Sequence, residues 1–361
     1  MKTIVRRTAL AVCTFVLALI LPTAASAACA GFDDVPESAD CYESVMYLAE
    51  HEITRGTGNN IFSPDTPVTT SQWAIMLCRA YGVETNGSTW SELSRSAVEQ
   101  SYRKGWLSET AISTPNAQLC RGALYKSAFA AAQIPVYDSV LYEGGVALSD
   151  YENCIRIGKE LQLCGKEDNA NEIVTRGEAT KLLHAILTRT FTVEAPAAPV
   201  TLVNASGVNV NDFLLELRKL PEQVLDAFNA AGWTYCIDFD YMGGLSKRLN
   251  MSCIGATNYS RKTIYISEAS ATLHEFGHFL DWTLGFPAEH EQLFRAEAAA
   301  APLRDYAKTN AREYFADCFA YCIIHGNDSE MMESLRKNAP QTCTYFEELG
   351  KDSWSRSIRS K

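Results

Sequence analysis

The sequence predicts an α+β protein, in which a mostly helical three-repeat module precedes a small domain with a short mixed sheet. The first observation behind this is a helix–loop–helix pattern that recurs three times between residues 32 and 190. The second is a set of short runs rich in β-branched and aromatic residues over 233–267. These runs lead into an amphipathic helix, and 361 residues are enough for two such domains.

The N-terminus has the features of a secretory signal peptide over residues 1–27. Three basic residues precede an apolar run over 9–21, and Ala25-Ser26-Ala27 forms a small-residue cleavage site. We therefore expect a secreted mature chain without a lasting transmembrane span. Cys29 follows the cleavage site closely and leaves lipid attachment open, although Ser26 stands where lipoprotein signals favour leucine.

The three repeats of the N-terminal half share one design. They span residues 32–82, 90–134 and 148–190. Each supplies a helix, a loop and a second helix, and none buries its apolar face alone, so the three must pack together. Arg121 and Arg176 occupy the same place at the start of the second helix in repeats two and three, where repeat one has Thr70.

A Pro/Ala-rich linker, predicted at 191–204, separates the repeats from a second domain at 205–361. In that domain an amphipathic pattern predicts a helix over 211–231, which Pro221 kinks or divides. The remaining expected elements are strands at 233–239, 252–257 and 263–267, a loop at 241–245, and helices at 330–337 and 341–349.

Residues 274–278 read His-Glu-Phe-Gly-His. On a helix, His274 and His278 project from one face and can hold one zinc ion. Glu275 lies between them, off the line of the ligands, where it is placed to act as a general base on a water at the metal. A helix with two histidines that bind nothing is the alternative.

A catalytic zinc site needs three protein ligands, and a second helical segment over 310–326 supplies the third. Glu313 and Asp317 lie four positions apart on one face, so Glu313 is the candidate ligand and Asp317 the candidate partner of a ligand histidine. Asn310 and Glu313 also fit a capping box, in which Glu313 only caps its own helix. Tyr306 is a candidate hydrogen-bond donor to an oxyanion, with ordinary packing as the alternative.

These motifs resemble the catalytic domain of the anthrax lethal factor family and of its secreted clostridial relatives, the Pro-Pro endopeptidases, which are gluzincin metallopeptidases. The similar stretch runs from about residue 208 to the C-terminus. The resemblance implies a zincin-like fold and a protein or peptide substrate. The roles that it implies are Zn2+ binding by His274, His278 and Glu313, general-base catalysis by Glu275, oxyanion stabilisation by Tyr306 and support of a ligand by Asp317. Nothing in the sequence indicates the Pro-Pro preference.

The repeats resemble a set of three S-layer homology modules, which hold secreted proteins to the polysaccharide of Gram-positive cell walls. In that family an arginine at the start of the second helix contacts the acidic glycan. The resemblance therefore implies binding of secondary cell-wall polysaccharide through Arg121 and Arg176, at the surface or wall of a Gram-positive-type bacterium. Thr70 in place of arginine indicates that the first repeat lacks this contact. A spacer fold without wall binding is the alternative.

The net charge of −11 becomes about −14 once the three basic residues of the signal are removed. This charge argues against nucleic acid and against anionic membranes as partners. The chain has 12 cysteines, and loss of Cys13 with the signal leaves an odd number, so at least one is unpaired within the mature chain. The pairs that spacing favours are Cys41–Cys78 and Cys236–Cys253.

The sequence therefore predicts a secreted, cell-wall-associated zinc metalloendopeptidase. Two alternatives stay open. One is a non-catalytic, wall-anchored binding protein whose zincin domain has decayed. The other is a zinc peptidase that acts on wall peptides rather than on ordinary protein. The complete set of zinc-site residues favours an enzyme over a decayed domain.

Overall fold

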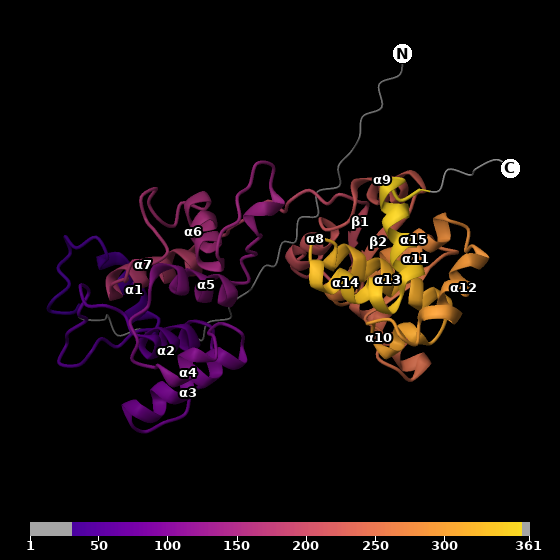
Figure 1. The fold of residues 1–361 in the computed structure, drawn as a ribbon. Coiled ribbons are helices and arrows are strands. Elements are labelled where there is room, and N and C mark those ends of the chain that lie inside the picture. Colours follow the sequence, from indigo (N-terminus) through magenta and orange to yellow (C-terminus); the bar gives the residue numbers. More distant parts are fainter. Residues whose placement is uncertain (1–30, 356–361) are drawn as a thin grey trace, which may run out of the picture. The chain divides into compact units, whose positions relative to one another are not determined.

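The structure is a computed structural model that describes residues 31–355, so the predicted signal peptide lies outside the described residues. Over these residues the protein is α+β, as the sequence predicts, with many helices and one small mixed sheet (Figure 1). The chain divides into two compact units between Pro196 and Ala197. None of the helices within 31–355 is both long enough and apolar enough to cross a lipid bilayer.

The N-terminal unit consists mainly of helices joined by loops, some of them long (Figure 1). Its elements are α1 (Tyr42–Glu50), α2 (Thr70–Ala80), α3 (Trp90–Arg103), α4 (Thr110–Ser113), α5 (Arg121–Ala132), η1 (Ser139–Leu141), α6 (Asp150–Glu160) and α7 (Arg176–Thr188). Helices α2, α3, α6 and α7 each begin with a capping box. The helical pattern of repeat two predicts a helix from Ala97 to Gly105, but the capping box of Thr89 and Glu92 starts α3 at Trp90.

A closed ring of backbone hydrogen bonds joins the three repeats. The N–H of Val68 donates to the carbonyl of Val174 (3.0 Å), that of Val174 to Leu119 (3.1 Å), and that of Leu119 to Val68 (3.0 Å). Each of these residues lies two positions before the start of α2, α5 or α7. The ring therefore relates the repeats by an approximate three-fold axis, and each repeat satisfies its backbone groups only with the others in place.

The apolar core of this unit is shared among the repeats in the same way. Trp73 from α2, Phe129 from α5 and Leu183 from α7 belong to one buried cluster. The indole N–H of Trp73 donates to the hydroxyl of Ser127 on α5 at 2.7 Å. Because this cluster draws on helices from all three repeats, each repeat depends on its neighbours for much of its burial.

The ten cysteines within 31–355 are free thiols, so the expected pairs Cys41–Cys78 and Cys236–Cys253 are wrong. The sulfur of Cys78 lies 3.6 Å from the carbonyl of Ala97, in the small core between α2 and α3. Cys41 belongs to a separate buried cluster beside α1. Cys41 and Cys78 thus pack in different apolar clusters.

The C-terminal unit is built around the mixed sheet, in which the strand order is β1-β2-β4-β3. The strands are β1 (Leu202–Asn204), β2 (Thr234–Ile237), β3 (Gly255–Asn258) and β4 (Thr263–Ile266). β1, β2 and β4 are parallel, and β3 pairs antiparallel with β4 at the edge. The helices are α8 (Asn211–Leu217), α9 (Glu222–Ala230), α10 (Phe239–Leu249), η2 (Ala269–Ala271), α11 (Thr272–Thr283), α12 (Ala288–Glu297), η3 (Asp305–Lys308), α13 (Ala311–His325), α14 (Ser329–Asn338) and α15 (Pro340–Lys351).

Three details of this unit differ from, or refine, the prediction. Strand β1 lies in the segment assigned to the linker, so the unit begins before residue 205. Three residues are too few for a strand pattern to be recognised in sequence. The predicted loop at 241–245 lies inside α10, which Asp238 caps. Pro221 does divide the helix predicted over 211–231, because α9 begins immediately after it.

Helix α11 packs against β3 and β4 and carries both histidines of the His-Glu-x-x-His motif. The turn η2 runs directly into the helix, and no side chain caps its start. A buried contact replaces the cap. The hydroxyls of Tyr235 on β2 and Thr272 on the first turn of α11 lie 2.7 Å apart. The sheet thus holds the start of the helix.

Helices α11 and α13 pack against each other with an unusually close approach at Gly277 (Figure 1). A Cβ atom on Gly277 would lie 2.6 Å from the Cα of Ala316 and 2.8 Å from its carbonyl oxygen. Any side chain at this position therefore forces the two helix backbones apart. The glycine inside the motif is thus explained by the space between two helices rather than by its backbone freedom.

We expect Gly277→Ala to lower the free energy of unfolding of the C-terminal unit by about 1–3 kcal/mol, because the added methyl meets backbone that cannot turn away. Urea unfolding of the purified protein measures this change. The matched control is Gly243→Ala in α10, where an added Cβ meets nothing within 4 Å. That substitution should keep or raise stability, since alanine favours a helix more than glycine. Equal effects of the two variants would contradict the interpretation.

Candidate metal centre

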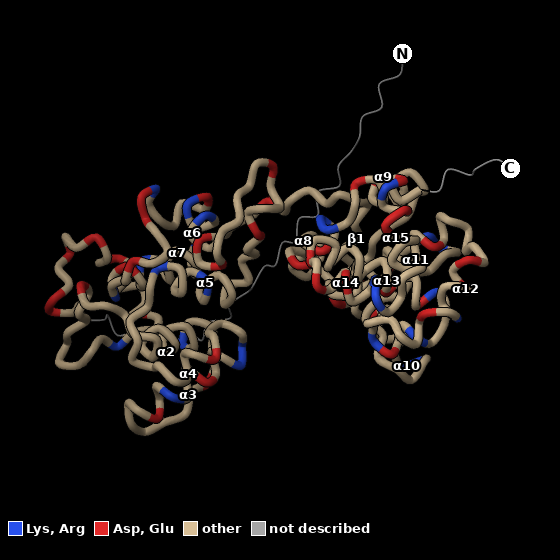
Figure 2. The backbone as a smooth tube through the Cα atoms, viewed as in Figure 1, with Lys and Arg blue, Asp and Glu red and all other residues tan. Residues whose placement is uncertain are grey.

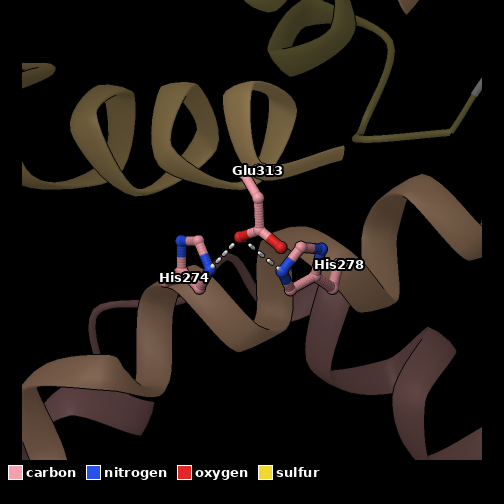
Figure 3. A group of neighbouring side chains, drawn as sticks. All are labelled: His274, His278 and Glu313. Atoms are coloured by element: carbon pink, nitrogen blue, oxygen red, sulfur yellow. Dashed lines mark ion pairs between the residues drawn. The ribbon is translucent and has the colours of Figure 1, made fainter. Parts of the chain in front are cut away.

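Two imidazole groups from α11 and one carboxylate from the first turn of α13 point toward a common space between the helices (Figure 3). The Oε2 atom of Glu313 lies 3.0 Å from Nε2 of His274 and 3.3 Å from Nε2 of His278. Both histidines are buried. Within 31–355 these residues form the one group of three or more metal-ligating side chains whose ligand atoms lie within 4.8 Å of one another.

The group has the properties of a cation site. Oε2 of Glu313 is buried and makes no hydrogen bond in the described structure, although it lies between two nitrogens. Burying a carboxylate oxygen without a hydrogen bond destabilises the fold. A cation bound between the three groups would remove this destabilisation. Zinc bonds of 2.0–2.1 Å in a tetrahedral arrangement separate neighbouring ligand atoms by roughly 3.3 Å. The spacing of 3.0–3.3 Å therefore fits such an ion.

The electrostatics of the group favour positive charge among its side chains. Burial alone raises the pKa of Glu313, but the contacts with His274 and His278 outweigh burial and hold the pKa well below its usual range. Burial alone lowers the pKa of His274, but the contacts with Asp317 and Glu313 outweigh it and raise the pKa to about 9. Negative charge thus dominates the surroundings of the imidazoles, which favours a positive ion among them.

A second layer of residues orients His274. Oδ1 of Asp317, one turn beyond Glu313 on α13, lies 2.6 Å from Nδ1 of His274. The guanidinium of Arg304 donates two hydrogen bonds to the same carboxylate, from Nε to Oδ2 at 2.6 Å and from Nη2 to Oδ1 at 2.7 Å. Burial raises the pKa of Asp317, but these partners outweigh it and lower the pKa. The ionised carboxylate accepts the Nδ1 proton of His274 and leaves Nε2 to face the centre.

Glu275 is buried, and the edge strand β3 determines where its carboxylate lies. The hydroxyl of Thr257 donates to Oε2 of Glu275 at 2.7 Å. A Cβ atom on Gly255 would lie 2.6 Å from Oε1, so the carboxylate fits only because this residue has no side chain. Sequence analysis missed both strand residues and also Arg304. Gly255 and Thr257 lie 20 and 18 residues before Glu275, and Arg304 lies 13 residues before Asp317. No local sequence pattern links these residues to the motif.

Tyr306 lies beside the centre on η3, with its ring centroid 6.1 Å from that of His274 and the guanidinium of Arg304 above its ring at 5.3 Å. Burial, with the nearby carboxylates, raises the pKa of its phenol to about 12, so the phenol keeps its proton at neutral pH. Asn310 caps α13 by accepting from the backbone N–H groups of Arg312 and Glu313. The carboxylate of Glu313 therefore faces the histidines and does not complete a capping box.

Residues 235–349 match the family model of anthrax toxin lethal factor, N- and C-terminal domain. This range includes every residue of the centre and of the layer around it. Residues 31–70 match the family model of the S-layer homology domain. The two matches confirm both resemblances, in the order that the sequence indicated. No curated protein matches the chain. The lethal factor family is zinc-dependent, and S-layer homology domains bind cell-wall polysaccharide.

The candidate wall-binding residue Arg121 lies at the start of α5, close to three acidic side chains. Acidic and basic positions are interspersed along the backbone around α5, α6 and α7 (Figure 2). The guanidinium of Arg121 is 3.0 Å from Glu178, 3.1 Å from Glu172 and 3.7 Å from Asp168, and only 11% of its side chain is exposed. The positive charge of Arg121 is therefore compensated inside the protein. An anionic polymer has to compete with these carboxylates or displace one of them.

The equivalent residues of the other repeats are more deeply buried. Arg176 is 3% exposed, donates from Nε to the carbonyl of Phe62 at 2.9 Å, and stacks over the ring of Phe62. Burial lowers its pKa to about 10. Thr70 is also buried and donates to the carbonyl of Ala117. The structure buries Arg176, whereas the wall contact implied by the resemblance requires a guanidinium within reach of the polymer.

We expect Arg304→Leu to lower the free energy of unfolding by about 1–3 kcal/mol, because buried Asp317 then loses two charge-assisted hydrogen bonds. Urea unfolding of the metal-free protein measures this change. The matched control is Arg295→Leu, which removes a similar contact of 2.7 Å to Glu291 that is exposed to water. Exposed pairs contribute less than about 1 kcal/mol. The interpretation fails if the control is as unstable as Arg304→Leu.

Proposed function

We propose that the protein is a secreted, cell-wall-associated zinc metalloendopeptidase. The observation that carries the proposal is the convergence of His274, His278 and Glu313 around a buried carboxylate oxygen that has no hydrogen-bond partner within the described residues. The match to the lethal factor family over the same residues supports it. The S-layer homology match supports the association with the cell wall.

In this proposal a zinc ion held by His274, His278 and Glu313 supplies Lewis acidity toward a peptide carbonyl and water that is nucleophilic near neutral pH. Glu275 acts as the general base that takes the proton of the attacking water and then passes it to the leaving amine. Tyr306 keeps its proton and donates a hydrogen bond to the carbonyl oxygen as it gains charge.

The surrounding chain supports these roles. Thr257 and Gly255 set the position of the Glu275 carboxylate, and Asp317 with Arg304 sets the orientation of His274. Strand β3 lies at the edge of the sheet, next to α11. An extended peptide can pair with such an edge through main-chain hydrogen bonds, which places its carbonyls in series along the centre.

We expect the zinc-replete protein to contain about one zinc ion per chain, as measured by elemental analysis of the purified protein. Glu313→Ala should lose that zinc, because two imidazoles alone leave the set of ligands incomplete. Glu275→Gln should keep the zinc but lower kcat/KM for peptide cleavage by about 10²–10⁴-fold, since it removes the general base without removing a ligand.

The outcomes of this experiment separate the alternatives. Absence of zinc from the replete wild-type protein would refute the enzyme and favour a wall-anchored binding protein. If the protein binds zinc and cleaves wall peptides but not unfolded protein, its substrate is a wall peptide and the proposed chemistry stands. Full activity of Glu275→Gln would show that another group is the base.

We further propose that the repeats hold the protein to secondary cell-wall polysaccharide and that Arg121 and Arg176 take part. Of the two, Arg121 is nearer to solvent, so it is the one to test directly. Replacement of buried Arg176 removes a contact to the backbone of Phe62 and would report on folding as well as on binding.

We expect Arg121→Met to weaken co-sedimentation with purified cell-wall material, because a guanidinium binds anionic groups in a bidentate manner and methionine does not. The matched control is Lys126→Met on the same helix, which removes the same charge from an exposed ion pair with Asp150. The control should sediment as the wild type does. If both variants bind equally well, Arg121 is not a wall contact.

A further inference from the structure

The cleft beside His278 contains one arginine that no role described so far uses. This cleft has a volume of about 640 Å³ and is lined by the zinc-site residues together with side chains from α10, β3 and the start of α13. Arg312, the residue before Glu313, is exposed and is the one lysine or arginine among the described residues that line it. The cleft on the other side of His274 is different, because apolar residues such as Leu273, Leu303 and Ile324 line much of it.

Two aromatic rings hold the guanidinium of Arg312. Its Cζ atom lies 4.4 Å from the ring centroid of Phe286 and 5.9 Å from that of Tyr259. The two rings also contact each other edge to face, with centroids 5.4 Å apart. Phe286 comes from the turn after α11 and Tyr259 from the turn after β3, so three separate elements meet at this side chain.

The backbone of Phe286 adds a second observation. Its φ of 51° lies in the left-handed region, which is rare for a bulky residue. The N–H of Phe286 donates to the carbonyl of Asp281 at 3.1 Å, which holds this conformation after the end of the helix. In this turn the ring of Phe286 contacts the guanidinium of Arg312.

Arg312 has no acidic partner within the described residues. No carboxylate there lies within 4.0 Å of its guanidinium, whereas the other arginine of the site, Arg304, binds Asp317. The acids that line the same cleft are engaged elsewhere: Glu275 with Thr257, Glu291 with Arg295, and Glu313 with His274 and His278. The charged guanidinium of Arg312 is thus held beside the candidate metal centre, with N–H groups that no described carboxylate accepts.

We propose that Arg312 is a specificity residue, which binds a carboxylate of the substrate in the cleft beside His278. The inference rests on the proposed peptidase function and gives its substrate class: peptides with an acidic side chain, or a free C-terminal carboxylate, near the scissile bond. Guanidinium binds carboxylate with two parallel hydrogen bonds, and packing on aromatic rings orients the group beforehand. The Arg312 side chain therefore loses little conformational entropy when the peptide binds.

The test uses the full-length, zinc-loaded protein and a randomised decapeptide library prepared with free-acid and with amidated C-termini. Wild-type protein should cleave peptides enriched in Asp or Glu at one position, or free-acid peptides alone, and these two results identify the source of the carboxylate. Arg312→Met should retain its zinc and lose the enrichment, because methionine keeps the packing on the rings but not the charge. Arg312→Glu should shift the preference toward Lys or Arg.

A binding measurement provides a readout that does not depend on turnover. The best cleaved peptide and a counterpart with the acidic group replaced by its amide are titrated calorimetrically into zinc-loaded Glu275→Gln. We expect the acidic peptide to bind at least about tenfold more tightly, and the difference to disappear when Arg312→Met is added. Arg336→Met, which removes an exposed arginine on α14 that does not line the cleft, is the control and should keep the difference.

Failure of this inference is distinct from failure of the proposed function. Cleavage without any acidic preference, or with the same preference in Arg312→Met, would refute the role of Arg312 and leave the peptidase intact. If the zinc-loaded wild type cleaves no peptide of the library, the peptidase proposal fails and this inference fails with it.

Discussion

The candidate centre depends on the close crossing of α11 and α13 at Gly277. One helix carries both imidazoles, and the other carries Glu313 and Asp317 one turn apart. Neither helix has a complete set of ligands. Because Gly277 has no side chain, the backbones approach until Ala316 fills the space that a Cβ would take. At that separation the carboxylate of Glu313 reaches both imidazole nitrogens, and Asp317 reaches the far side of His274. A wider crossing would leave two half-sites that face each other without contact.

The crossing also buries charge, and the structure compensates each charge in a different way. Asp317 is paired with His274 and with Arg304, and Glu275 accepts a hydrogen bond from Thr257. Glu313 is the exception, since one of its oxygens is buried without a hydrogen-bond partner in the described structure. A buried carboxylate oxygen without a hydrogen bond indicates a ligand-binding role. The two neighbouring imidazoles favour a cation as that ligand. Arg312 differs from these carboxylates. Its cation packs on the rings of Phe286 and Tyr259 and has no carboxylate partner within residues 31–355.

The N-terminal unit shows the same dependence on contacts between distant segments. The ring of Val68, Leu119 and Val174 closes only when all three repeats are present. Of the residues two positions later, Thr70 and Arg176 are buried and Arg121 is half-buried. Arg176 serves the backbone of Phe62, and Arg121 is neutralised by three carboxylates. Thr70 replaces an arginine at a position where a smaller donor also finds a backbone carbonyl.

By itself the sequence determined whatever depends on local spacing. The four-residue separations of His274 from His278 and of Glu313 from Asp317, the division of a helix at Pro221 and the strands β2 and β4 all follow from patterns within one element. Tertiary structure decided the rest. The start of α3, the short strand β1 and the helix α10 were missed or misplaced because caps and strand partners outweigh weak local patterns. Arg304, Thr257 and the rings around Arg312 join the site from other elements, and only the folded chain brings such distant residues within hydrogen-bond or ring-contact distance.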